Sequence, residues 1–92
     1  MSFRRIEYFL SVAKHLNFTK AARECYVAQA AISQQIKQFE EELGFKLFNR
    51  GGASVSLTPA GEYFAKQCQA VLAQYNGAVK QARFLAEGKK RD

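Results

Sequence analysis

Apolar residues recur along this chain with the period of an α-helix, and they predict four helical segments. The first segment runs from about Ser2, as its N-cap, to His15 or Leu16. Its apolar residues stand at i, i+3, i+4 and i+7, which is the pattern of a helix with one buried face. These residues are Ile6, Phe9, Leu10 and Ala13.

A short second helix is expected next, closed by a tight turn at residues 26–28. Thr19 is predicted to be its N-cap, because a side-chain oxygen at that position can accept a hydrogen bond from a free backbone amide. The helix then covers residues 20 to about 25. Its inward residues are Ala21, Ala22 and Cys25.

The third helix is predicted over residues 29–43. At 100° per residue its apolar positions cluster within about 60° of one another, so they form a single buried stripe. Gly44 is well placed to end this helix in a left-handed conformation, with Phe45 folding back onto Phe39. The stripe consists of Ile32, Ile36, Phe39 and Leu43.

Beyond Gly44 the period changes from that of a helix to that of a strand. Two short alternating runs lie on either side of Gly51-Gly52, which predicts a small β-hairpin with a flexible tip. The alternating residues are Leu47, Asn49, Val55 and Leu57.

A long fourth helix is predicted from Thr58, as N-cap, and Pro59, as first helical residue, to about Glu87, where Gly88 ends it. Such a helix, about 45 Å long, overhangs a domain this small. Tyr63, Phe64 and Cys68 can pack back onto the domain, whereas the distal half needs a partner. A second copy is the favoured partner, through a nearly heptad seam. The predicted dimer interface is Val71, Leu72, Tyr75, Ala78, Val79, Ala82 and Leu85.

The order of these elements indicates a mainly α fold of the winged helix-turn-helix type. We expect residues 1–57 to form the winged helix-turn-helix, 58–87 the linker and dimerisation helix, and 88–92 a basic hinge or tail. In this fold the helix after the turn enters the major groove of DNA, while the preceding helix braces it against the backbone.

The third helix carries a polar face roughly 150° from its apolar stripe. Gln can pair with adenine, Ala can touch a thymine methyl group, and Lys can reach guanine or phosphate. Glu41 would be repelled by phosphates, so only the N-terminal half of the helix is expected in the groove. The face consists of Ala30, Ser33, Gln34, Lys37 and Glu41.

The composition supports a polyanionic partner. The chain has 92 residues, 48% of them apolar, and a formal net charge of +6. Basic and acidic residues balance over 31–60, so the charge supplies attraction from the flanks and the uncharged face supplies sequence reading. No membrane span or signal peptide is expected, and Cys25 and Cys68 are interpreted as small core residues. We expect no metal, no cofactor and no catalytic group.

Two other interpretations fit parts of the pattern. A polar helix face is solvated in most proteins, so the chain could be a helical protein-interaction module with incidental basic charge. That alternative predicts little salt-dependent affinity for DNA. A shape-directed RNA binder is the second alternative, although no aromatic stripe for base stacking lies on the polar faces.

The chain resembles the N-terminal DNA-binding domain of LysR-type transcriptional regulators over essentially its whole length. The matching residues are Ala21-Ala22, the run VAQAAISQQI at 27–36, Phe39-Glu40, Leu43-Gly44, Leu47-Phe48-x-Arg50 and Leu57-Thr58-x-Ala60-Gly61. The resemblance implies a dimer on a pseudo-palindromic operator in the bacterial cytoplasm. It also implies a small-molecule effector bound only by a C-terminal domain that this chain does not include.

By the same resemblance, DNA contacts fall on two groups of residues. Ala28 and Ala30 depart from the family, which often has Ser and Pro there, and residues 53–54 lack a frequent wing Arg. Base contacts are implied for Gln29, Ala30, Ser33, Gln34 and Lys37, and backbone contacts for Thr19, Lys20, Arg50 and Ser54.

The remaining polar residues are expected to have ordinary structural roles. His15 is predicted to interact with the last carbonyl groups of the first helix. The acidic run Glu40-Glu41-Glu42 is interpreted as a solvated face, and Gln35 and Gln38 as solvated side chains.

Overall fold

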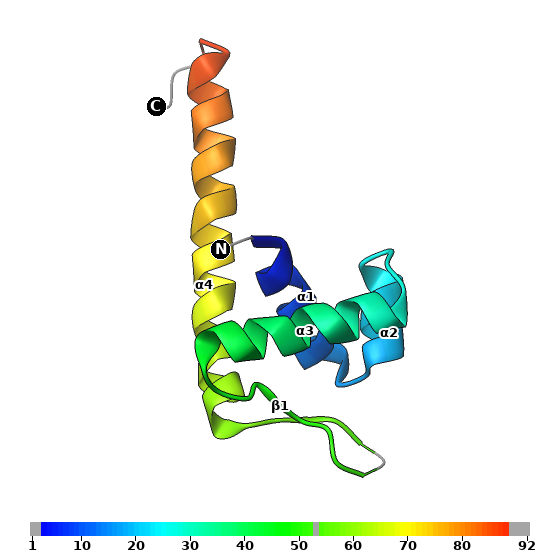
Figure 1. The fold of residues 1–92 in the computed structure, drawn as a ribbon. Helices are drawn as coiled ribbons and strands as arrows, with labels where there is room; N and C mark the ends of the chain where they lie inside the picture. Colours follow the sequence, from blue (N-terminus) through cyan, green and yellow to red (C-terminus); the bar gives the residue numbers. More distant parts are fainter. Residues whose placement is uncertain (1–2, 53, 89–92) are drawn as a thin grey trace.

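The structure, a computed structural model, describes residues 3–52 and 54–88. Three helices and a hairpin form a small head, and a long fourth helix rises from it (Figure 1). The head and the protruding helix together measure 54 × 26 × 21 Å. The elements are α1 (Phe3–His15), α2 (Phe18–Glu24), α3 (Gln29–Leu43), β1 (Phe48–Asn49), β2 (Ser56–Leu57) and α4 (Pro59–Ala86).

Aromatic side chains fill the centre of the head. The ring of Phe9 on α1 lies 6.4 Å from Phe39 on α3, 5.6 Å from Phe48 on β1 and 5.7 Å from Phe64 on α4. Burial of each such ring contributes about 1.5–3 kcal/mol, so this contact holds all four elements together. The predicted apolar stripes of α1 and α3 do face this core, with Phe9, Ile32, Ile36 and Phe39 essentially inaccessible.

The start of α2 differs from the prediction. Asn17, and not Thr19, is the N-cap, and its side chain accepts a hydrogen bond from the backbone N–H of Lys20 at 2.9 Å. Both residue types can cap a helix, and the choice follows from the chain path after Leu16, whose φ of 50° turns the backbone sharply. The helix therefore begins at Phe18. The predicted N-cap of α1, Ser2, lies outside the described residues.

Helix α3 has the predicted bounds. Gly44 ends it with φ 84°, a conformation that glycine adopts without strain. At the other end Ala28 makes no side-chain capping hydrogen bond. Phe45 does not follow the prediction of a contact with Phe39, since its ring lies against Phe64 of α4 at 6.0 Å.

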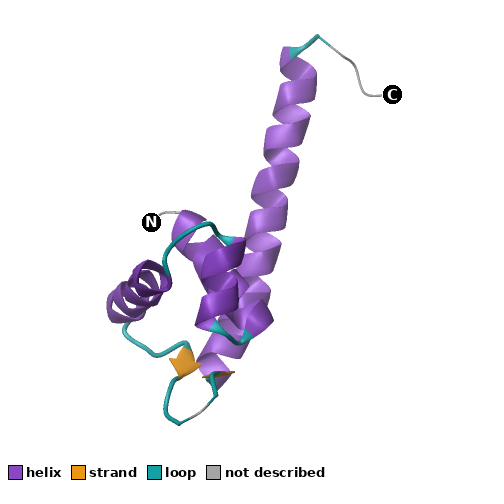
Figure 2. Ribbon diagram, turned by 90° about the vertical axis from the view of Figure 1, so that its right-hand side faces the viewer, coloured by secondary structure: helices purple, strands orange, loops and turns teal. Residues whose placement is uncertain are grey.

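The predicted hairpin is present as two very short antiparallel strands. Phe48 pairs with Leu57 and Asn49 with Ser56. Figure 2 shows this pair at the base of the head, next to the first turn of α4. Gly52, at the tip, has φ 82°.

The first turn of α4 is anchored to the hairpin as well as capped. The hydroxyl of Thr58 accepts a hydrogen bond from the N–H of Gly61 at 2.9 Å and donates to the carbonyl of Lys46 at 2.7 Å. Gly61 is buried against the backbone of Leu47, and a Cβ there would lie 2.1 Å from the carbonyl oxygen of Leu47. Only glycine therefore fits at position 61 without a shift of the backbone. The helix ends as predicted before Gly88, whose φ is 77°.

Helix α4 packs on the head only along its first half. Ala65 and Cys68 belong to the core, and Phe64 and Leu72 pack against it. Tyr63, which was expected to join them, is 67% exposed because it lies on the opposite side of the helix. Tyr75 still meets the ring of Phe3 on α1 at 4.7 Å, and the last turns of the helix stand free of the head in both views (Figures 1 and 2).

Candidate nucleic-acid interface

The turn between α2 and α3 sets the angle between the two helices. Val27 donates its backbone N–H to the carbonyl of Ala22 at 3.0 Å, which closes the end of α2. Tyr26 adopts φ 58°, an uncommon conformation for a residue with a side chain, and it is 94% exposed. The turn thus forms at residues 26–28, as the sequence predicts.

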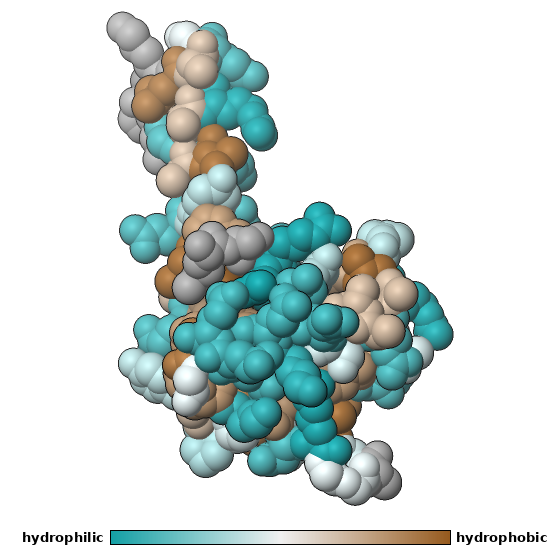
Figure 3. Space-filling model, in the orientation of Figure 1, coloured by the Kyte–Doolittle hydropathy of each residue, from teal (hydrophilic) through white to brown (hydrophobic). Residues whose placement is uncertain are grey.

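The residues predicted to read bases share one side of α3. Gln29, Ala30, Gln34 and Lys37 are exposed, and Ser33 is half-buried between them. Ala30, Ser33, Gln34, Lys37 and Glu41 line one shallow surface depression. Figure 3, in the orientation of Figure 1, shows hydrophilic side chains gathered over α3 on the viewer's side of the head.

Thr19 and Gln29 meet across the helix-turn-helix. The hydroxyl of Thr19 donates to Oε1 of Gln29 at 3.0 Å. This bond joins the first turns of α2 and α3. Lys20 is exposed beside it at the first turn of α2, where free amides and the helix dipole favour an anion.

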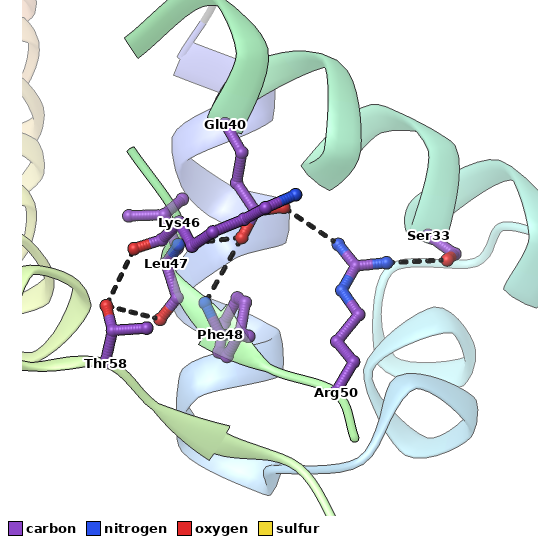
Figure 4. Close-up of polar contacts among 7 residues, drawn as sticks. All are labelled: Ser33, Glu40, Lys46, Leu47, Phe48, Arg50 and Thr58. Atoms are coloured by element: carbon purple, nitrogen blue, oxygen red, sulfur yellow. Dashed lines mark hydrogen bonds and ion pairs between the residues drawn. The ribbon is translucent and has the colours of Figure 1, made fainter. Parts of the chain in front are cut away.

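Glu40 corrects the interpretation of the acidic run as a solvated face. Its side chain is only 3% exposed, and its Oε2 accepts hydrogen bonds from the backbone N–H groups of Leu47 at 2.7 Å and Phe48 at 3.2 Å (Figure 4). These two amides belong to the chain that enters the hairpin. A buried carboxylate needs such partners, and here it fixes the wing to α3.

Arg50 is held between α2 and α3. Its Nη2 lies 3.4 Å from Oε1 of Glu40, and its Nη1 donates to Oγ of Ser33 at 3.2 Å (Figure 4). The guanidinium carbon lies 4.7 Å from the ring centre of Phe18 on α2. The predicted wing residue Arg50 therefore contacts the reading face directly, whereas Ser54 is exposed beyond the tip of the hairpin.

Arg5 binds the side chains of two glutamines that were predicted to be solvated. From α1 it donates to Oε1 of Gln35 and of Gln38, each at 3.2 Å, and it forms an ion pair of 2.6 Å with Glu42. Gln35 and Gln38 are thus fixed against α1. Only the side of α3 away from Arg5 is free to present uncharged polar groups to a ligand.

The family "Bacterial regulatory helix-turn-helix protein, lysR family" matches residues 3–62. The chain belongs to this family. It is a LysR-type helix-turn-helix DNA-binding domain with the predicted winged fold, and the relatives that it matches are transcriptional regulators.

Individual relatives agree with this assignment. The chain is 43% identical over 88 residues to the transcriptional regulator AlsR of Bacillus subtilis, and 42% identical over 88 residues to BudR of Klebsiella aerogenes. It covers 29% of the first relative and 62% of the second, so it spans only part of the length of each. The crystal structure of the BenM DNA-binding domain on catB site 1 DNA superposes with a TM-score of 0.93 and 36% identity, over 96% of this chain and 95% of that chain.

A second polar cluster of this LysR-type domain lies on α1 and α2, away from α3. Glu24 accepts from Ser11 at 2.6 Å and from Lys14 at 3.0 Å, and His15 lies 3.3 Å from it. The hydrogen bond from Ser11, followed by those from Lys14 and His15, lowers the pKa of Glu24 to about 2. The Nε2 atom of His15 therefore faces a carboxylate, and the interaction of His15 with the last carbonyl groups of α1 stays a prediction.

The two cysteines lie in or beside the core. Cys68 is buried, which raises the pKa of its thiol, and Cys25 is half-buried. Within the described ranges no group of three or more metal-ligating side chains comes together. None of the described helices is both long and apolar enough to cross a bilayer.

Proposed function

We propose that this LysR-type domain reads operator DNA with the N-terminal half of α3 in the major groove. The base-reading residues are Gln29, Ala30, Ser33, Gln34 and Lys37. The observation that carries the proposal is their common position on the side of α3 that Arg5 leaves free, with four of them exposed and Ser33 half-buried among them. The similar BenM domain was crystallised on DNA, which supports the same use of this face.

The DNA backbone is proposed to contact Thr19 and Lys20 at the start of α2, and Arg50 and Ser54 in the wing. Lys20 supplies a positive charge beside the N-terminus of α2, where phosphate is favoured. Arg50 is shared with Ser33 and Glu40, so its contribution to phosphate binding is smaller than that of a free arginine. The wing then contributes less than α3.

We further propose that residues 1–57 form the reading unit, 58–87 a dimerising linker helix, and 88–92 a hinge. A two-fold dimer through α4 places two α3 helices on the two halves of a pseudo-palindromic operator. The full regulator, in the bacterial cytoplasm, binds a small-molecule effector in a C-terminal domain. The lengths of AlsR and BudR beyond the matched part support a longer parent chain.

The proposal is tested by Gln34→Ala, because Gln34 is exposed and lies in the middle of the face. Duplexes selected by the wild-type chain from a random pool serve as the operator, and shuffled duplexes as the reference. The variant is expected to lose about 1–3 kcal/mol of discrimination between them, since one base contact is removed.

Gln69→Ala, an equal truncation at an exposed position of α4, is the matched control and is expected to keep the wild-type ratio. An unchanged ratio of affinities in Gln34→Ala would show that this part of α3 does not read bases.

A further inference from the structure

The contact between Arg50 and Ser33 restricts what Ser33 can offer to a ligand. A guanidinium group has only hydrogen-bond donors, so the Oγ of Ser33 is the acceptor in the 3.2 Å contact with Nη1. The hydroxyl proton is not used in this bond, so it remains available to donate. Ser33 is half-buried and lines the depression on the open side of α3 together with Gln34 and Lys37.

The guanidinium of Arg50 is held in place independently of Ser33. Its other terminal nitrogen meets the buried carboxylate of Glu40 at 3.4 Å, and its plane lies over the ring of Phe18. Glu40 is itself fixed by two backbone amides of the hairpin. Glu40 and Phe18 therefore orient the guanidinium of Arg50 toward Ser33.

Gln29, one turn earlier on α3, also has its acceptor oxygen bound within the chain and its donors free. Thr19 donates to its Oε1 at 3.0 Å, which orients the amide and leaves the NH₂ group with two free donors. Lys37, one turn after Ser33, carries only donors. The row Gln29, Ser33, Lys37 thus presents donors, although Gln and Ser could in principle act as acceptors.

We propose that Arg50 is a positioning residue that makes Ser33 a hydrogen-bond donor to DNA, so that Ser33 selects a base presenting an acceptor in the major groove. The matching acceptors are N7 and O6 of guanine, N7 of adenine and O4 of thymine, whereas the exocyclic amines of cytosine and adenine are donors that compete with Arg50 for the oxygen of Ser33. This inference rests on the proposed function, in which Ser33 faces bases. It adds the chemical class of base and the residue that enforces it.

The test removes acceptors from DNA one at a time. Duplexes selected from a random pool by the wild-type chain are resynthesised with 7-deazapurine at each purine, 6-thioguanine at each guanine, or 4-thiothymine at each thymine. For the wild type, one such position per half-site is expected to weaken binding about three- to tenfold, the range of a single hydrogen bond. In Ser33→Ala the same change is expected to have no effect on affinity.

Arg50→Lys tests the positioning role. It keeps the positive charge, but a single ammonium group cannot bridge Ser33 and Glu40 as the planar guanidinium does. The penalty at the identified position is expected to fall to less than half of its wild-type value. A weaker phosphate contact of residue 50 would lower the affinity for selected and shuffled duplexes alike, so it would not by itself reduce this penalty. Arg83→Lys on α4 is the matched control and is expected to keep the full penalty.

Three outcomes separate the possibilities. If Arg50→Lys, and a second variant Arg50→Gln, both keep the wild-type penalty, Arg50 does not position Ser33. If Ser33→Ala instead removes sensitivity to deletion of an exocyclic amine, Ser33 acts as an acceptor and the inference is overturned. If Ser33→Ala keeps every sensitivity of the wild type, Ser33 does not read bases, and the proposed function fails at this residue. Thermal unfolding of each variant confirms that it is folded.

Discussion

Glu24 shows how a single residue at the surface of the head can make stability depend on pH. Its carboxylate accepts hydrogen bonds from Ser11 and Lys14 and lies 3.3 Å from Nε2 of His15, all three on α1. These contacts join the end of α2 to α1. These partners hold its pKa at about 2, below the ordinary value of 4.5 for a glutamate. A carboxylate with a depressed pKa contributes stability above its unfolded pKa and loses that contribution as the pH falls toward its folded pKa.

We therefore expect Glu24→Gln to flatten the loss of stability between about pH 4.5 and pH 2. The variant is less stable than the wild type at neutral pH, and the difference shrinks over this window because the wild-type carboxylate becomes protonated. Urea unfolding at a series of pH values measures it.

Glu41→Gln, which removes an exposed carboxylate from α3, is the control and should retain the wild-type pH dependence. Parallel curves for Glu24→Gln and wild type across the acid range would contradict the assigned role of Glu24.

Glu40 and Glu41 are neighbours of the same residue type with different environments. Glu40 is buried and satisfied by two backbone amides and Arg50, whereas Glu41 is exposed. Helical periodicity places Glu40 beside Phe39 and Ile36 on the inner side of α3, which is the one feature of the sequence that indicates its burial. Acidic residues are rarely buried, so residue type alone predicts a solvated side chain. The backbone amides that satisfy Glu40 come from a distant segment, and residue type carries no information about them.

At the scale of elements, the close packing of α4 on the hairpin depends on Gly61. Its backbone approaches the carbonyl of Leu47 so closely that a methyl group has no room. The backbone atoms involved also carry the hydrogen bond from Thr58 to Leu47, so the contact cannot open without loss of the anchor.

Gly61→Ala is expected to lower the free energy of unfolding by at least about 1–3 kcal/mol, the usual cost of overpacking. Gly77→Ala is the matched control on the same helix, since nothing lies within 4 Å of a Cβ there. It should raise stability by about 0.5–1 kcal/mol because alanine favours a helix. Chemical unfolding of both variants tests the pair, and equal effects would show that the approach to Leu47 is not limiting.

The caps of α2 and α3 show what local sequence can and cannot predict about an element. The end of α3 at Gly44 was predicted correctly because glycine is the residue that adopts the left-handed conformation at low cost. The start of α2 was predicted two residues late, because Asn17 and Thr19 are both good caps. The choice between them depended on the backbone at Leu16.

At the scale of the whole molecule, the free half of α4 has an apolar side without cover from the head. Val71, Tyr75 and Leu85 are among the exposed large apolar residues. Leu72 packs on the core and Tyr75 contacts Phe3 at a ring distance of 4.7 Å, so part of the predicted dimer seam is already used within the chain. The residues beyond Tyr75 are therefore the part of the proposed interface that the head does not cover.

We expect Leu85→Glu to weaken the proposed dimer about tenfold or more, because a carboxylate would be buried without a partner at the interface. Sedimentation measures the dissociation constant, with and without selected operator duplex. Ala73→Glu, which adds the same charge at an exposed position on the other side of α4, is the control and should dimerise as the wild type does. A wild-type chain that remains monomeric in the presence of operator would contradict dimerisation through α4.

The sequence by itself determined the helices, the hairpin and the exposed side of α3, because each follows from periodicity and capping within one segment. The stripe from Ile32 to Leu43 both bounded α3 and placed Ser33 and Gln34 on its other side. What only the tertiary structure decided is which polar groups meet between segments. The bonds of Arg50 to Ser33, Glu40 to the hairpin amides, and Thr19 to Gln29 join residues seven to seventeen positions apart. Such pairs depend on the angles at which α2, α3 and the hairpin pack, and a one-dimensional pattern does not contain those angles.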